Sequence, residues 1–447
     1  MDMKIARKLS MVAGIFLSIA LHASNSSNTE FMFKAMSILD DKRNGFAPSN
    51  GSGYLLKLKY ETPSIITDDL KAAAGVYING DAGLTEWDEK AAPVYNKPAY
   101  GMVVDTNGRS KALLGELYLS YKNDYFNVKM WRQPLDTPLT EIFTSLMPNL
   151  YEAYMLSIDI FKDIRLNVGH ISKISFGSRA MADWGLIGEK TATAGVGLGA
   201  SGVLFKQAGG TLEQAKFYNI GTAAGKKSTD GRSLVGITYK GVKNMQTDLW
   251  IYRSYDIAQD YYAQIRYSLP LTNKTQIRFG AQYLMQKDIG ESLAGSIDFH
   301  IFGVEAEFDA NKWGINASYN VSGDAEGTKG QYFNAWGADP AYTSTLFSRN
   351  EYRNDVDAYK IGVFYMLMKN LKLIVDYANY GKSKTTAANN MTSFATEDAY
   401  ELDTILAYKP SKEWTLKLFN TRRLSEFDGY GFERRMNHYR VIASYIF

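Results

Sequence analysis

The sequence predicts an all-β fold: a transmembrane antiparallel β-barrel of about 18 strands, with 16 as the alternative. Three observations predict it. Apolar and polar side chains alternate along many short runs, which places them on opposite faces of a strand. Short and long connections alternate between these runs. The mean hydropathy of −0.26, with 31 tyrosines and 22 phenylalanines, is too polar for spanning helices but suits a polar lumen with aromatic girdles.

The N-terminal residues have the pattern of a secretory signal. Lys4, Arg7 and Lys8 form a basic start, residues 9–21 are apolar, and Ala23 suits a cleavage position. A single membrane anchor is disfavoured because the apolar stretch has about 13 residues, whereas a spanning helix needs roughly 20. We therefore expect residues 1–23 to be a removed signal peptide and residues 24–447 to form one barrel domain.

Strand-like runs and turns can be placed in order along the chain. The clearest strands are residues 54–61, 113–121, 261–268, 277–283, 313–321, 359–365, 371–377, 400–408 and 414–419. Short periplasmic turns are expected at 122–124, 162–163, 241–245, 270–274, 309–312, 368–370 and 409–413. Long extracellular loops are expected at 79–112, 132–152, 174–231, 323–355, 381–397 and 424–432. Counting back from a periplasmic C-terminus gives about 17 strands, and the run 30–36 makes the number even.

The final run, residues 433–447, shows the alternation most clearly. One face carries Tyr439, Val441, Ala443, Tyr445 and Phe447, and the other carries His438, Arg440 and Ser444. Aromatic side chains at even spacings before a terminal phenylalanine resemble the signal that the bacterial barrel-assembly machinery recognises. We therefore expect Tyr439, Tyr445 and Phe447 to form an assembly signal, with that machinery and outer-membrane lipid as partners.

Several function classes are disfavoured by what the sequence lacks. It has no cysteine, so disulfides, thiolate chemistry and cysteine metal sites are absent. A net charge of +3 is too small on this length to indicate a nucleic acid as partner. Outside the signal peptide the only histidines are His170, His300 and His438, without metal-ligand spacing, and no nucleophile-elbow motif is present. We expect no cofactor, no metal and no catalysis.

Motifs spread over most of the mature chain resemble the OprD family of substrate-specific outer-membrane porins. They are residues 114–118, residues 131–133 followed by Thr137 and Pro138, residues 147–149, Gly323 with Asp324, Trp336 with residues 340–342, and Asp376 with Tyr377. The resemblance implies an 18-stranded barrel, a third loop folded into the lumen, and a lumenal row of basic side chains that guides carboxylates. Two departures are Trp131, where the family usually has glycine, and residues 145–147, which replace an Arg-Leu pair.

Strand parity gives independent candidates for that basic row. If apolar residues face lipid, the lumenal bases are Arg165, Arg266, Arg278, Lys360, Lys372, Lys417, Arg423 and Arg440. Clustered cations in a narrow channel concentrate anions, and arginine binds carboxylate bidentately. Lumenal acids are expected at Glu116, Glu305, Asp376, Glu401 and Asp403. The alternative is that these charges only solvate the lumen.

The loop at 132–152 is the first candidate for a constriction. Arg132, Asp136, Thr137 and Glu141 could form an eyelet of mixed charge, although a loop that merely holds its own shape fits these four residues equally well. The Gly-rich segment 174–231 is the second candidate.

Together these features predict a porin of the Gram-negative outer membrane. We expect passive diffusion of small hydrophilic solutes, with a preference for small carboxylates or other anions. An adhesin or structural anchor that works through its long loops is the alternative, and a hydrolase is the least favoured class. The sequence leaves open whether the protein is a monomer or a homotrimer.

Overall fold

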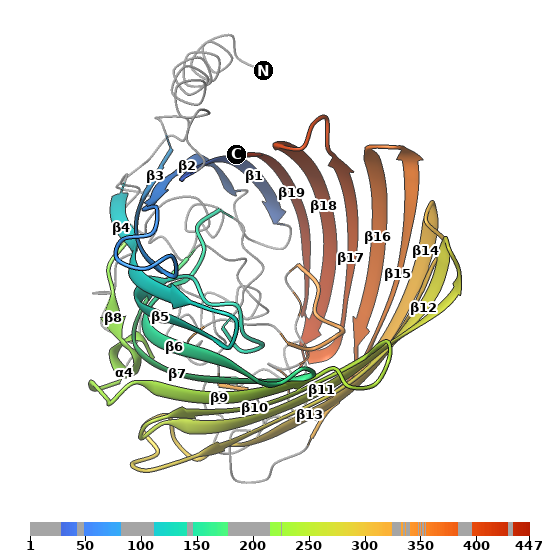
Figure 1. Ribbon diagram of the computed structural model, residues 1–447. Helices are drawn as coiled ribbons and strands as arrows, with labels where there is room; N and C mark the ends of the chain where they lie inside the picture. The colour runs from blue at the N-terminus through green and yellow to red at the C-terminus, as the bar shows by residue number, and fades with distance from the viewer. Residues whose placement is uncertain are drawn as a thin grey trace, which may run out of the picture.

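The computed structural model describes residues 28–42, 49–81, 111–140, 146–177, 215–224, 226–323, 332–333, 336, 340–346, 348, 350, 353, 355–382, 396–427 and 432–447. Within these residues no helix combines the length and the apolar character needed to cross a bilayer. The fold is a single antiparallel sheet (Figure 1).

The strands follow one another around the barrel in sequence order. They are β1 (Thr29–Lys42), β2 (Ser49–Glu61), β3 (Leu70–Gly80), β4 (Lys111–Lys122), β5 (Phe126–Gln133), β6 (Leu150–Phe161), β7 (Ile164–Ser175), β8 (Tyr218–Asn219), β9 (Arg232–Tyr239), β10 (Met245–Ser254), β11 (Ala258–Thr272), β12 (Thr275–Asp288), β13 (Asp298–Asp309), β14 (Trp313–Ser322), β15 (Asp357–Met368), β16 (Leu371–Tyr380), β17 (Thr396–Tyr408), β18 (Trp414–Phe427) and β19 (Phe432–Ile446). A one-turn helix, α4 (Ile220–Ala223), follows β8.

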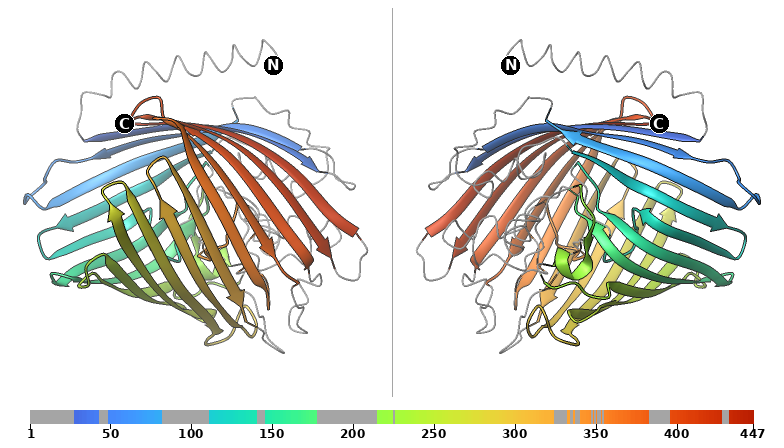
Figure 2. Two further views of the ribbon diagram at one scale, coloured as in Figure 1. Left: turned by 90° about the vertical axis from the view of Figure 1, so that its right-hand side faces the viewer. Right: turned by 90° about the vertical axis from the view of Figure 1, so that its left-hand side faces the viewer.

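Pairing of β1 with β19 closes the sheet, so the barrel has no free edge. Strand β7 pairs directly with β9, and the two-residue β8 pairs only with the end of β7. Among the described residues the wall therefore contains 18 strands, namely the 19 of the sheet without β8. The expected count of 18 is confirmed, and the alternative of 16 is wrong. Figure 2 shows that the strands tilt across the barrel, as closure of a sheet requires.

Side chains alternate between an exposed outer face and a largely buried inner face. On β10, Leu249 and Ile251 are exposed, whereas Trp250 and Tyr252 are buried inside. One bulge reverses this order on β4. Leu114 and Glu116 pair with the consecutive residues Val76 and Gly75 of β3, so Gly115 is an extra residue without a partner. Leu114 before the bulge and Leu119 after it both remain exposed outside. The bulge therefore keeps apolar side chains towards lipid although the residue parity changes.

The connections follow the expected alternation with one addition. Each short turn expected on the periplasmic side joins consecutive strands, and the longer connection 62–69 joins β2 to β3. On the opposite side, the connection 255–257 is also short, which the sequence had not indicated. The alternation of loop lengths fixed the strand directions, but it is not strict.

The seam between β1 and β19 is closed by backbone and aromatic contacts. Phe31 N donates to Phe447 O at 3.0 Å, and Phe447 N donates to Phe31 O at 3.1 Å. The ring centroids of Phe31 and Phe447 are 6.0 Å apart. The ring centroid of Tyr445 lies 5.1 Å from that of Trp414 on β18. The residues proposed as an assembly signal thus lie along the seam, and their role in assembly stays a prediction.

Replacing Phe447 with alanine should lower the yield of folded barrel in the outer membrane. The change removes a ring contact worth roughly 1 kcal/mol at the seam and the last aromatic of the proposed signal. The measurement is the fraction of heat-modifiable protein on unheated gels. Ser444→Ala, on the other face of β19, is the control and should leave this fraction unchanged. Equal yields for both variants would contradict the assembly role.

Candidate functional site

The third long connection, between β5 and β6, begins by running along the inner wall. Leu139 is fully buried there. The hydroxyl of Tyr252 on β10 donates to Thr137 Oγ1 at 3.0 Å, and Leu139 N donates to the Tyr252 hydroxyl at 3.4 Å. On β6, the Tyr151 hydroxyl donates to Thr140 O at 2.9 Å. These lumen-facing side chains hold residues 137–140 inside the barrel.

A second segment inside the barrel comes from the connection between β14 and β15. Phe333 N donates to Gln286 Oε1 on β12 at 2.8 Å, and Thr343 N donates to Asn320 Oδ1 on β14 at 2.9 Å. The hydroxyl of Tyr380 on β16 donates to Thr343 O at 2.7 Å. Polar side chains of several strands therefore bind the backbone of this segment.

Two of the lumenal acids expected from the sequence bind the same segment. Ser348 N donates to Glu401 Oε2 at 2.8 Å, and Leu346 N donates to Asp403 Oδ2 at 3.2 Å. Both carboxylates are almost fully buried on β17. They hold a loop in place, so they are not simply solvated lumenal charges.

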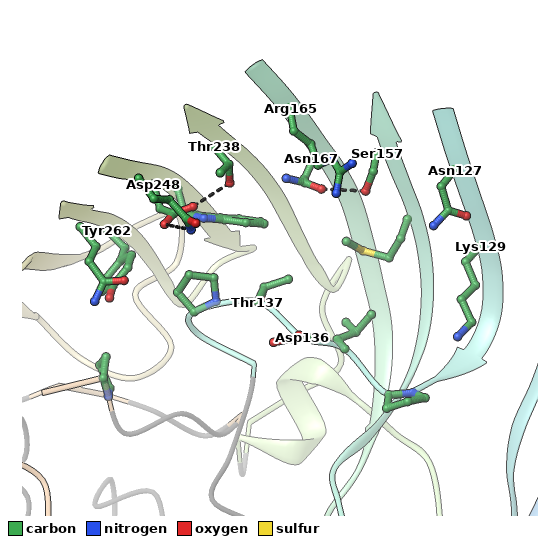
Figure 3. A pocket seen from close by; sticks show the side chains of 18 of the residues that line it. Asn127, Lys129, Asp136, Thr137, Ser157, Arg165, Asn167, Thr238, Asp248 and Tyr262 are labelled. Carbon is green, nitrogen blue, oxygen red and sulfur yellow. Dashed lines mark hydrogen bonds between the residues drawn. The ribbon is translucent and has the colours of Figure 1, made fainter. Parts of the chain in front are cut away.

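The two inward segments meet at Trp336. Its carbonyl oxygen accepts from the Tyr151 hydroxyl at 2.7 Å and from Asn149 Nδ2 at 3.1 Å. A cavity of about 640 Å³ lies between the third connection and the wall of β5–β7 and β9–β11 (Figure 3). Pro138 and Pro340, one from each inward segment, line it together. This narrowed part of the lumen is the candidate functional site.

Charged side chains of both signs line the cavity: Lys129, Arg165, Arg266, Asp136 and Asp248. Asp248 accepts from Thr238 Oγ1 at 2.6 Å and from Gln246 Nε2 at 2.7 Å, so its carboxylate is held in place (Figure 3). The Lys129 ammonium lies 3.8 Å from the Tyr118 ring centroid, a cation–π contact.

Arg266 occupies a special position at this site. It also lines a second cavity, of about 610 Å³, together with Arg278 and Glu305. Nearby Tyr342 stays neutral, because burial and the Glu305 carboxylate raise the pKa of this phenol to about 12. Its hydroxyl accepts from Gln264 Nε2 at 2.8 Å. The charge at the junction of the two cavities therefore comes from Arg266 and the carboxylates around it.

The eight bases expected in the lumen differ in their partners. Arg165 forms a bidentate pair with Asp159 at 2.7 and 2.9 Å. Arg278 pairs with Glu307, and Arg423 Nε lies 4.0 Å from Glu401 Oε2. Lys360 Nζ donates to Ser344 O at 3.1 Å, and Arg440 Nε donates to His438 Nε2 at 3.1 Å. Three of these eight bases have no carboxylate ion-pair partner within the described part of the chain: Arg266, Lys372 and Lys417.

The residues proposed for the constriction are placed differently from one another. Asp136 and Thr137 line the cavity. Arg132 does not line it, because its guanidinium binds Glu152 Oε1 at 3.0 Å and Leu114 O at 3.2 Å. Glu141 lies outside the described residues.

Sequence reasoning missed a charged network on the wall formed by β1–β4. Lys57 Nζ lies 2.7 Å from both Glu30 Oε1 and Glu116 Oε1, and the Tyr77 hydroxyl donates to Glu116 Oε1 at 2.7 Å. Lys59 reaches the same two carboxylates at 3.4 and 3.7 Å. The signal was present, since Lys57 and Lys59 are two residues apart on the polar face of an alternating run.

Trp131, at the stem of the third connection, has a left-handed backbone with a φ of 88°. This conformation costs a residue with a side chain roughly 1–3 kcal/mol, whereas glycine adopts it freely. It gives a physical reason for the glycine that the OprD pattern has at this position.

In the described ranges, no group of three or more His, Asp or Glu side chains is arranged to hold a metal ion.

Replacing Trp131 with glycine should cost little stability despite the size of the change. Relief of backbone strain offsets the loss of a side chain that is 46% exposed. Trp313 is equally exposed, at 47%, and has no left-handed backbone. It packs on Phe308 with ring centroids 5.2 Å apart, whereas the Trp131 ring contacts the Arg132 guanidinium, whose Cζ lies 5.6 Å from the ring centroid. The temperature of heat modification on gels should therefore fall for Trp313→Gly and stay near the wild-type value for Trp131→Gly. An equal fall for both would contradict the strain argument.

Comparison with known proteins decides the family. Residues 102–447 match the family model described as outer membrane porin, OprD family. The chain belongs to the OprD family. Members of this family are channels of the Gram-negative outer membrane, so the chain is an outer-membrane porin for small solutes rather than an enzyme. The resemblance seen in the sequence is thereby confirmed.

Solved structures of similar fold agree with the barrel of this porin. Pseudomonas aeruginosa OpdL has a TM-score of 0.67 at 14% identity, covering 94% of this chain and 98% of its own. Pseudomonas aeruginosa OccK9 (OpdG) reaches 0.69 at 13% identity with the same coverage. Acinetobacter baumannii OccAB4 reaches 0.66 at 14% identity, covering 95% of this chain and 99% of its own. No curated protein sequence matches the chain.

Proposed function

We propose that this porin favours small carboxylate-bearing solutes, which it guides past the constriction by a basic lumenal track centred on Arg266. The observation that carries the proposal is the position of Arg266 in the lining of both cavities, without a carboxylate partner among the described residues. A guanidinium with free donors can bind a passing carboxylate through two parallel hydrogen bonds.

The other bases contribute according to their pairing. Arg165, Arg278 and Arg423 each have a carboxylate within ion-pair distance, which cancels much of their field. Lys129 adds to the track from β5, because it lines the first cavity and its contact is an aromatic ring. Lys372 and Lys417, which strand parity assigns to the lumenal face, extend the track.

A relative supports the choice of solute. Pseudomonas aeruginosa OpdK, whose structure was solved with vanillate, has a TM-score of 0.67 at 13% identity and covers 94% of this chain and 98% of its own. Vanillate is a small aromatic carboxylate. A track that binds the carboxylate group accepts such a molecule as well as aliphatic acids.

The proposal is tested with purified porin in bilayers and liposomes. The reversal potential under a potassium chloride gradient should show anion preference. Uptake of propionate and benzoate should exceed that of propionamide and benzamide, which match them in size but lack the charge. A cation-selective reversal potential, or equal uptake of each acid and its amide, would overturn the carboxylate preference and leave a general diffusion pore.

A further inference from the structure

We propose that Arg232 is a positioning residue that holds both inward segments of the porin in place through one stack of aromatic rings. Arg232 is the first residue of β9 and is fully buried, as is Asp260 on β11. Arg232 Nη2 lies 2.7 Å from Asp260 Oδ2. This base was not among the residues expected to face the lumen, and it has no role in the carboxylate track.

The guanidinium of Arg232 contacts two aromatic side chains. Its Cζ atom lies 4.7 Å from the ring centroid of Tyr252 and 4.7 Å from that of Trp336. Tyr252 stacks in turn on Trp250, with centroids 5.8 Å apart and planes 17° from parallel. The resulting stack runs from Trp250, in the lining of the larger cavity, to Trp336.

The rings supply interactions that hydrogen bonds do not. Arg232 Nε and Nη1 are buried and have no hydrogen-bond partner among the residues described. A buried charge with unsatisfied donors is costly unless another interaction offsets the cost. Two desolvated cation–π contacts provide that offset. Arginine suits the position because a planar guanidinium can stack on aromatic rings, whereas a lysine ammonium cannot.

Two rings of the stack, those of Tyr252 and Trp336, are each tied to one inward segment. Tyr252 holds the third connection through hydrogen bonds of its hydroxyl with Thr137 and the Leu139 amide. Trp336 belongs to the other segment, and its carbonyl accepts from Tyr151. Its indole Nε1 donates to Ile220 O at 3.3 Å. Because Arg232 contacts both rings, loss of the stack should loosen both segments together.

The main test variant is Trp336→Leu, which leaves the ion pair intact. A second variant, Arg232→Met with Asp260→Met, removes both charges, because loss of only one would leave an uncompensated buried charge. Trp313→Leu, on the exposed outer face, is the control. Single-channel conductance, open-channel noise and the largest permeating oligosaccharide are measured on variants that show wild-type heat modification.

Both variants should raise conductance roughly 1.5-fold or more, increase open-channel noise and admit larger oligosaccharides, because the constriction widens. Trp313→Leu should match wild type. A Tyr252→Leu, Trp336→Leu double variant should show less than the sum of the two single effects, because both changes break the same stack. Wild-type conductance and size limit in the folded Trp336→Leu variant, or additive effects in the double variant, would overturn the proposal.

Discussion

Replacing Arg266 with glutamine should shift the porin from anion preference towards cation preference while the barrel stays folded. Arg266 lies between exposed Ile265 and Tyr267, so its removal leaves the lipid-facing surface untouched. An anion passing at about 4 Å from a guanidinium gains roughly 1 kcal/mol even at the dielectric constant of water. Loss of the Arg266 guanidinium should reduce relative anion permeability roughly fivefold and slow uptake of small carboxylates.

Reversal potentials under a salt gradient measure this change. Arg253→Gln is a matched control, because Arg253 is exposed on the same face of β10 as Ile251 and packs on Tyr255 outside the lumen. Adding Arg278→Gln should shift the selectivity further towards cations, since it leaves the Glu307 carboxylate without its cationic partner. The effect should weaken as salt rises, because the Debye length is about 8 Å at physiological ionic strength. A folded Arg266→Gln variant with wild-type selectivity at low salt would exclude Arg266 as the centre of the track.

Shortening the third connection should give the second large effect, a rise in single-channel conductance. Gln133 pairs with Tyr151, so residues 135–149 can be replaced by Asn-Gly, a two-residue hairpin turn compatible with that register. The replacement removes Thr137, Leu139 and Asn149, which contact the inner wall or Trp336. Conductance should rise severalfold, because the narrow section of the lumen loses one of its two walls.

Unchanged conductance in a correctly folded variant would place the constriction elsewhere. The part of the connection between β7 and β8 at residues 178–214, outside the described residues, would then be the first alternative. A folded variant that conducts no ions would contradict the constriction role as well. Heat modification on gels identifies the folded variants in each case.

The strand pattern of this porin was predictable because each strand separates two solvents. In Ile277-Arg278-Phe279 and in Tyr439-Arg440-Val441, the two apolar side chains point to lipid and the arginine between them points to the lumen. Such triplets assign a face to the neighbouring residues of the same strand. Turn lengths then fixed the strand order and the count. Gly115 shows the limit of the rule, because a bulge inserts one residue and reverses parity without a marker other than the glycine itself.

The site was predictable only at the level of which residues face inward. Charge pairing depends on register, and Arg165 meets Asp159 only because a bulge follows at the hairpin. Arg232 and Asp260 are on strands separated by β10, so no local pattern relates them. The roles of Glu401 and Asp403 in holding a loop depend on where Leu346 and Ser348 lie, which alternation along a strand does not determine.

The seam between β1 and β19 has a consequence for the order of folding. Met32 and Ile446 are partners across the seam although over 400 residues separate them. Closing a chain of that length carries an entropic cost of roughly 5 kcal/mol, whereas hairpins such as β11–β12 close over a few residues. We therefore expect the hairpins to form early and the seam to form last. Until then the sheet has two unpaired edges, which are the sites where a nascent barrel can pair with the wrong partner.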